Sequence, residues 1–162
     1  MRCLFFLTAG FMIGIQFLTG TAFSFDKVLS LYNDAGWIAY TSDRAIFERA
    51  INKSLYVLTA WSGEQLVGLV RAVGDAETII YVQDILVLKS CRKQGIGKQL
   101  LTKLLEQYST VRQIVLMTDN INETISFYES FGLTRTEKLQ LQTFVRLNKH
   151  DEELDLNSRG IS

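Results

Sequence analysis

The stretch "LVLKSCRKQGIGKQLLTKLL", residues 86–105, decides how the rest of the chain is interpreted. An apolar run leads into a short polar run, and apolar residues then recur at helical spacing. This order predicts a strand, a glycine-rich turn and a helix that begins near Ile96. Within the turn, Arg92, Gly95 and Gly97 form the pattern R-x-x-G-x-G.

A strand, a glycine turn and a helix N-terminus together can bind an anion. The first N–H groups of a helix have no intrahelical acceptor, and the helix dipole adds partial positive charge there. Glycine lets a phosphate approach the backbone because no Cβ intervenes. Arg92, Lys93 and Lys98 would add charge-assisted contacts. The alternative is an exposed turn whose glycines only permit the bend, and the pattern alone leaves both interpretations open.

Two common nucleotide motifs do not fit this turn. A P-loop requires G-x-x-x-x-G-K-[ST], which the stretch lacks. A dinucleotide fingerprint requires G-x-G-x-x-G near the first strand of the fold, whereas this glycine pair comes late in the chain. The phosphate, if there is one, belongs to another class of ligand.

The composition excludes several function classes. The chain has 162 residues, of which 48% are hydrophobic, and this is enough for one domain with a core. Lys+Arg and Asp+Glu both number 17, so nothing points to nucleic acid or an anionic membrane as the partner. The single histidine, His150, excludes Ser-His-Asp triads and multi-histidine metal sites. We therefore expect no metal.

The elements predicted from periodicity and turn residues make an α/β chain with a mixed sheet, because hairpins come first and strand-helix-strand units later. Helices are expected at 24–36, after a Ser24 cap, at 41–54, capped by Thr41 or Ser42, and at 119–132, with Asn120 and Glu123 at capping-box spacing. Strands are expected at 13–19, 54–61, 65–73, 78–88, 112–118 and 139–147.

The N-terminus permits two interpretations. Residues 1–25 carry one charge, Arg2, and resemble a signal peptide that is also nearly long enough to span a bilayer. Glycines interrupt this stretch, however, and it contains the first predicted strand. We expect an apolar extension at 1–11, a single domain at 12–148 and a polar tail at 149–162. The protein is then cytoplasmic; the alternative is export or tethering through residues 1–25.

Two motifs resemble one family. "ILVLKSCRKQGIGKQLL" is similar to motif A of the GNAT superfamily of acyl-CoA N-acyltransferases, whose signature is [QR]-x-x-G-x-[GA]. "NETISFYESFGL", which begins about 30 residues after Arg92, resembles motif B. The resemblance covers roughly residues 13–147. It implies a GNAT-like fold, with a central mixed sheet flanked by about four helices.

The resemblance implies how coenzyme A binds. The motif A loop would wrap the pyrophosphate, mostly through backbone N–H groups, and the preceding strand end would pair with the pantetheine arm. Asn122 would lie near the pantetheine; its alternative role is helix capping. The loop residues implied are Arg92, Lys93, Gln94, Gly95, Ile96, Gly97 and Lys98, and the strand residues are Ile85, Leu86 and Val87.

Four further residues are implied at the reaction site. Tyr128 matches the tyrosine that acts as general acid in many members, and a phenol can protonate a leaving thiolate. Asp84 is a candidate base. Trp37 and Tyr40 would wall the acceptor pocket. Each has a structural alternative: a buried carboxylate for Asp84, and aromatic packing for the other three.

The resemblance thus implies an acetyl-CoA-dependent N-acetyltransferase, in which a primary amine of a small molecule or peptide attacks directly in a ternary complex. The alternative is a CoA-binding sensor or regulatory module of the same fold without turnover. Tyr128 favours the enzyme. Neither nucleic acid nor membrane is expected as a partner, and a homodimer through the last strands or first helices, common in the family, stays open.

Overall fold

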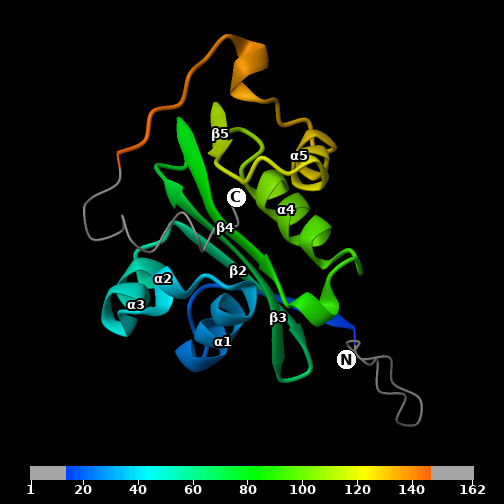
Figure 1. Cartoon of the computed structure of the whole chain (residues 1–162). Helices are drawn as coiled ribbons and strands as arrows, with labels where there is room; N and C mark the ends of the chain where they lie inside the picture. Colours follow the sequence, from blue (N-terminus) through cyan, green and yellow to red (C-terminus); the bar gives the residue numbers. More distant parts are fainter. Residues whose placement is uncertain (1–13, 147–162) are drawn as a thin grey trace. The chain divides into compact units, whose positions relative to one another are not determined.

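A computed structural model describes residues 14–146 of the chain (Figure 1). The chain divides after Leu116 into two compact units, so the described parts are residues 14–116 and 117–146. The predicted extension at 1–11 and tail at 149–162 lie outside the described residues. The two units are described separately below.

The first unit is built on a five-stranded sheet with the order β1-β2-β3-β4-β5. The first four strands pair antiparallel with their neighbours, whereas β5 runs parallel to β4. The predicted mixed sheet is therefore confirmed. The strands are β1 Ile15–Thr19, β2 Tyr56–Ser62, β3 Gln65–Gly74, β4 Ile79–Val87 and β5 Gln113–Leu116.

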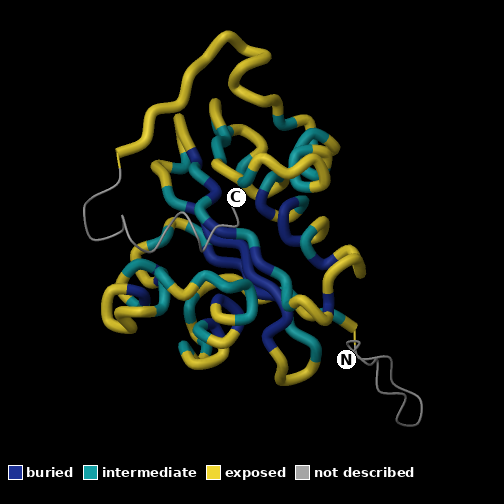
Figure 2. Tube along the Cα trace, viewed as in Figure 1, coloured by how far each residue is buried: buried dark blue, intermediate teal, exposed yellow. Residues whose placement is uncertain are grey.

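Helices pack on both faces of this sheet (Figure 1). Residues of α1 and α3 join one buried apolar cluster with β3, and residues of α4 join another with the opposite side of β2, β3 and β4. The central strands are accordingly the most buried part of the unit (Figure 2). The helices are α1 Phe25–Ala35, α2 Ile38–Thr41, α3 Arg44–Asn52 and α4 Ile96–Gln107, and the 3₁₀ turn η1 Lys89–Cys91 precedes α4.

The helix α4 lies very close to β3. Ile96, Leu100 and Leu104 are buried against the sheet, as their helical spacing predicts. A Cβ at Gly68 of β3 would lie 3.0 Å from Leu100 Cδ1 and 3.1 Å from the Leu86 carbonyl oxygen. Close packing of α4, rather than a turn, therefore favours glycine at this position.

A β-bulge interrupts the pairing of β3 with β4. Arg71 is opposite Asp84, but the next residue, Ala72, is opposite Val82, so Gln83 is an extra residue in β4. Since a bulge shifts the alternation of side chains, Val82 packs in the α4 cluster while Asp84 contacts α1 on the other face.

The strand β4 is paired on both sides over only half of its length. β5 pairs with Ile79–Val82 and ends at Leu116. From Gln83 to Val87, β4 pairs with β3 but with no other strand among residues 14–146. The backbone of this half thus has one open edge.

The second unit contains α5 Asn122–Glu129 and the 3₁₀ turn η2 Thr136–Leu139. The predicted strand at 139–147 is wrong for the described residues: Leu139 ends η2, Gln140 is left-handed (φ 57°), and no strand follows up to residue 146. The sequence alternation gave this segment strand propensity, but a strand also requires a paired neighbour.

The predicted helix caps need correction. The side chain of Asp43, not Thr41 or Ser42, caps α3 by accepting from the Ile46 N–H at 2.9 Å. Ser24 occupies the N-cap of α1, but its side chain makes no capping hydrogen bond. The N-cap residue of α5 is Ile121, which has no polar side chain, so the capping box of Asn120 and Glu123 is not formed.

We predict that Gly68→Ala lowers the free energy of unfolding by about 1–3 kcal/mol, because the added methyl group overpacks the contact between α4 and β3. Urea denaturation measures this change. Gly14→Ala is the control: a Cβ at Gly14 meets nothing within 4 Å, so its stability should match the parent protein. Equal stability of the two variants would show that α4 can move away without cost.

Candidate functional site

The loop between β4 and α4 presents backbone N–H groups at a helix N-terminus. Gly95 is the N-cap of α4 and is left-handed, with φ of 80°. The backbone hydrogen bond nearest this end runs from the Gln99 N–H to the Gly95 carbonyl. The N–H groups of Ile96, Gly97 and Lys98 therefore precede the intrahelical ladder and are available to an anion.

Gly97 has no packing reason to be glycine. A Cβ there would lie 3.6 Å from Val87 Cγ2, an ordinary contact, and its φ is not positive. In a helix, glycine is less favourable than alanine by roughly 1 kcal/mol. A glycine that destabilises the helix and fills no tight space is consistent with a ligand that approaches its backbone closely.

The side chains of the loop are exposed and partly fold back on it. Arg92 Nε donates to the Val87 carbonyl at 3.3 Å, and Gln94 Nε2 donates to the Ser90 carbonyl at 3.4 Å. The start of the loop is tied to α1, because the Lys89 N–H donates to Asp34 Oδ2 at 2.8 Å. Lys93 and Lys98 are also exposed. Exposed cationic side chains around a loop of backbone N–H groups suit a phosphate ligand.

The open half of β4 leads directly to this loop. Ile85 and Val87 pack partly buried toward α4, and Leu86 is buried in the α1 cluster. The side chains of these three residues thus belong to the core. The backbone groups of the same segment lie at the unpaired edge, where an extended ligand can add hydrogen bonds as a strand would.

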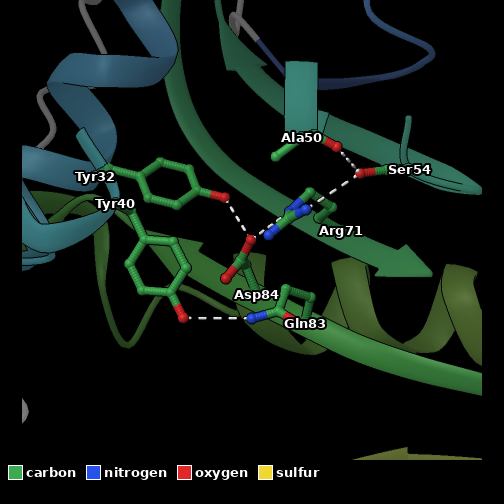
Figure 3. Close-up of polar contacts among 7 residues, drawn as sticks. All are labelled: Tyr32, Tyr40, Ala50, Ser54, Arg71, Gln83 and Asp84. Carbon is green, nitrogen blue, oxygen red and sulfur yellow. Dashed lines mark hydrogen bonds and ion pairs between the residues drawn. The ribbon is translucent and has the colours of Figure 1, made fainter. Parts of the chain in front are cut away.

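Asp84 lies at the centre of a buried polar cluster (Figure 3). Its Oδ2 accepts from Tyr32 of α1 at 2.6 Å and forms an ion pair with Arg71 of β3. Arg71 also donates to Ser54 Oγ at 3.3 Å. The other oxygen, Oδ1, is the only buried side-chain polar atom in the described part of the chain without a hydrogen-bond partner.

The electrostatics of this cluster keep Tyr32 a donor. Burial and the negative charge of Asp84 raise the pKa of Tyr32 well above its ordinary value. Burial also raises the pKa of Asp84, although the charge of Arg71 and the hydrogen bond from Tyr32 oppose this. A carboxyl with a raised pKa holds a proton more firmly than an exposed one does.

Aromatic side chains surround this cluster on the α1 and α2 side. The ring of Tyr32 lies 6.0 Å from Trp37 and 6.2 Å from Tyr40, and Trp37 lies 5.6 Å from Tyr40. The Gln83 side chain donates to the Tyr40 hydroxyl at 3.3 Å. Trp37 and Tyr40 also pack against the α1 cluster, so their structural role holds as well.

The sequence analysis missed three of these residues: Tyr32, Arg71 and Gln83. Tyr32 lies at an apolar position of the predicted helix at 24–36, and Arg71 interrupts the apolar residues of the predicted strand at 65–73. A charged residue inside a long apolar strand is itself a signal, because a buried charge requires a partner. Nothing in the sequence marks Gln83 as the bulge residue.

Asn122 and Tyr128 belong to the second unit. Asn122 is exposed and is the first residue of α5, so it is not the N-cap. Tyr128 packs 5.1 Å from the ring of Phe127. Burial, and the nearby charge of Asp119, raise the pKa of Tyr128 to about 12. The phenol therefore stays protonated at neutral pH.

Two further observations on the described residues concern metals and membranes. Among residues 14–146, no group of three or more His, Cys, Asp and Glu side chains could hold a metal ion. Within the same range, no helix is both long and apolar enough to cross a membrane.

Residues 23–149 match the family model of the acetyltransferase (GNAT) domain. The chain therefore belongs to the GNAT acetyltransferase family. Among curated protein sequences, none matches the chain significantly.

Solved structures agree with this assignment. A GNAT-family acetyltransferase of Streptococcus pneumoniae is 29% identical, with a TM-score of 0.75, over 84% of this chain and 99% of that one. A probable acetyltransferase of Staphylococcus aureus has a TM-score of 0.68 at 20% identity, over 83% and 100% of the chains. AAC(6')-Iy, solved with the bisubstrate analogue CoA-S-monomethyl-acetylneamine, has a TM-score of 0.65 at 17% identity, over 83% and 99%. At such identities the last two show the fold alone.

We predict that Gly97→Ala separates stability from ligand binding. The free energy of unfolding should stay equal or rise by up to about 1 kcal/mol, since the methyl group fits and favours the helix. The dissociation constant for coenzyme A, measured by isothermal titration calorimetry, should rise at least about tenfold because the methyl group blocks approach to the backbone. Gly14→Ala should change neither quantity. Unchanged affinity in Gly97→Ala would mean that the ligand does not approach this glycine.

Proposed function

We propose that the protein transfers an acetyl group from acetyl-CoA to a primary amine in a ternary complex. The observation that carries this proposal is the continuous open backbone surface formed by the unpaired half of β4 and the free N–H groups of α4. This surface suits a long ligand, because an arm with amide groups can pair with β4 and a pyrophosphate can bind the N–H groups of α4. The family membership, and the CoA analogue bound to AAC(6')-Iy, support the same ligand.

The loop residues hold the pyrophosphate in this proposal. Gly95, Ile96 and Gly97 offer N–H groups, while Arg92, Lys93, Gln94 and Lys98 offer side-chain donors. The backbone from Ile85 to Val87 pairs with the pantetheine arm, and Asn122 contacts it from α5. Arg92 must release the Val87 carbonyl, and its 3.3 Å hydrogen bond is long enough to exchange readily.

Bound acetyl-CoA supplies the acetyl group as a thioester. The acceptor nitrogen attacks in its unprotonated form, because only that form has a free lone pair. Asp84 Oδ1 accepts the proton that the nitrogen loses once the C–N bond forms, when that nitrogen has become strongly acidic. Tyr128 donates its phenolic proton to the sulfur as the C–S bond breaks. Asp84 then loses a proton and Tyr128 regains one, so amine and thioester yield amide and thiol.

Two further assignments follow from the ligand. Acyl-CoA is a cytosolic metabolite, so we place the protein in the cytoplasm. A sensor that binds coenzyme A without turnover is the competing function, and a homodimer is compatible with either. Release of free CoA from acetyl-CoA across small-molecule and peptide amines distinguishes enzyme from sensor: binding without release on any amine would contradict the enzyme.

We predict that Tyr128→Phe lowers kcat by about 10²- to 10⁴-fold, the usual contribution of a general acid. The affinity for coenzyme A should change less than about twofold. Tyr108→Phe is the matched control, because Tyr108 is also partly buried but packs against Tyr56 at the far end of α4. Normal turnover in Tyr128→Phe would remove this tyrosine from the mechanism.

The pH dependence should be one-sided. An alkylamine with a pKa of about 10.4 is mostly protonated at neutral pH, so kcat/KM should rise about tenfold per unit between pH 7 and 9. Tyr128 acts in its protonated form, which is lost only as the pH rises through its pKa of about 12. No fall in rate should therefore appear below about pH 11, as stopped-flow measurement of CoA release can check. A descending limb near pH 8 or 9 would assign the acid to another group.

A further inference from the structure

Three polar groups at the candidate site, Asp84, Gln83 and Tyr40, have contacts that bear on how the acceptor amine binds. Asp84 Oδ1 is buried and has no partner. The bulge places Gln83 next to Asp84, and Gln83 makes only a 3.3 Å hydrogen bond to Tyr40. In Figure 3, the unpartnered oxygen of Asp84 points away from Arg71, to the side where Tyr40 lies.

The carboxylate is held so that one oxygen remains available. Tyr32 and Arg71 both bind Oδ2, and neither binds Oδ1. A buried acceptor without a donor is unfavourable. A ligand that donates an N–H to Oδ1 therefore forms a hydrogen bond that the protein alone does not make, and this hydrogen bond favours binding. Because Arg71 already balances the charge of Asp84, the best ligand here is a neutral donor rather than a cation.

Aromatic rings lie beside the polar cluster on the side of α1 and α2. Tyr32, Trp37 and Tyr40 form a connected set of rings. Asp34 is the carboxylate of α1 that is closest in sequence to Tyr32. Its Oδ2 accepts a hydrogen bond from the Lys89 N–H. A ligand with several positive charges would find only one carboxylate in the polar cluster, and that one is already paired.

The helix α2 carries Tyr40 and is held against α1 by the hydrogen bond of Thr41 with Asn33 and by the packing of Tyr40. The helix α2 has four residues, Ile38–Thr41, and none of them is buried. Tyr40 reaches Gln83 from this helix through the long hydrogen bond. Access of a ligand to Oδ1 requires a displacement of α2, and because no residue of α2 is buried, this displacement would expose little core surface.

We propose that Asp84 Oδ1, Gln83 and Tyr40 bind the acceptor nitrogen, and that the acceptor is a monoamine with an apolar or aromatic body rather than a polycation. The amine donates one N–H to Oδ1 and exchanges hydrogen bonds with the Gln83 and Tyr40 side chains. Its body lies against the rings of Tyr32 and Trp37. This inference rests on the proposed acetyl transfer and names the substrate class for it.

The first experiment compares 2-phenylethylamine with spermidine and an aminoglycoside in the CoA-release assay. The expected kcat/KM is at least about 100-fold higher for 2-phenylethylamine. Preference for either polycation would overturn the substrate class while leaving acetyl transfer intact. Calorimetric binding of acetyl-CoA without CoA release on any of the three amines would also overturn the substrate class, whereas no release across the wider set of small-molecule and peptide amines would contradict the proposed transfer itself.

The second experiment tests the residues. Gln83→Met keeps the length of the side chain but removes its hydrogen bonds, and it should raise KM for 2-phenylethylamine about tenfold with kcat within threefold. Tyr40→Phe should act in the same direction. Gln113→Met, at the exposed start of β5, is the control and should leave both constants unchanged. Unchanged KM in both Gln83→Met and Tyr40→Phe would overturn the assignment of the nitrogen subsite.

Asp84→Asn completes the test. It keeps the shape of the side chain but weakens the acceptor, so kcat/KM should fall at least 100-fold while the dissociation constant for acetyl-CoA stays within twofold. Thermal unfolding of the variant shows whether the fold is retained. If Asp84→Asn fails to fold, the Gln83→Met and Tyr40→Phe measurements decide the proposal alone.

Discussion

One extra residue in β4, Gln83, governs the arrangement of the first unit. Without this bulge the alternation of the strand would turn Asp84 to the α4 side, where Ile80 and Val82 pack in an apolar cluster. A carboxylate there would meet neither Arg71 nor Tyr32. The bulge instead places the only buried acidic side chain of the described residues beside its two donors.

The same irregularity coincides with the end of the β4–β5 pairing. β5 follows β4 only up to Val82, the residue before the bulge. A bulge bends its strand and increases the local twist, which separates the following segment from a neighbour. The bulge thus lies where the polar cluster begins on one side of β4 and where the pairing with β5 ends on the other. A change at Gln83 that removed the bulge would be expected to alter both.

The strands and helices whose apolar residues recur at regular spacing were predicted from the sequence. The strand at β4, the helix α4 and the glycine turn between them follow from apolar spacing and from Gly95 and Gly97. The sequence did not predict the bulge, because β4 is apolar on both faces and a shift of one residue leaves no trace in such a pattern. Nor did it predict the end of the chain: the alternation at 139–147 indicated a strand, but a strand depends on a partner that local sequence cannot supply.

The site was predictable to the extent that it depends on backbone. Gly95 and Gly97 indicated amides at a helix start, and the structure has them there. The polar cluster depends on contacts between residues far apart in the chain, such as Tyr32 with Asp84, so no local pattern contains it. The prediction of Asp84 as a base therefore stays a prediction, whereas its burial and its ion pair with Arg71 are properties of the fold.

The half-paired strand also bears on solubility. Unpaired backbone at a sheet edge commonly recruits strands from other molecules and leads to aggregation. Here the unpaired stretch is short, from Gln83 to Val87, with β5 alongside the residues before it and the turn η1 soon after it. A long foreign strand could not continue past either end. The short open edge can thus bind a narrow ligand, whereas a strand of another protein could form only a few hydrogen bonds with it.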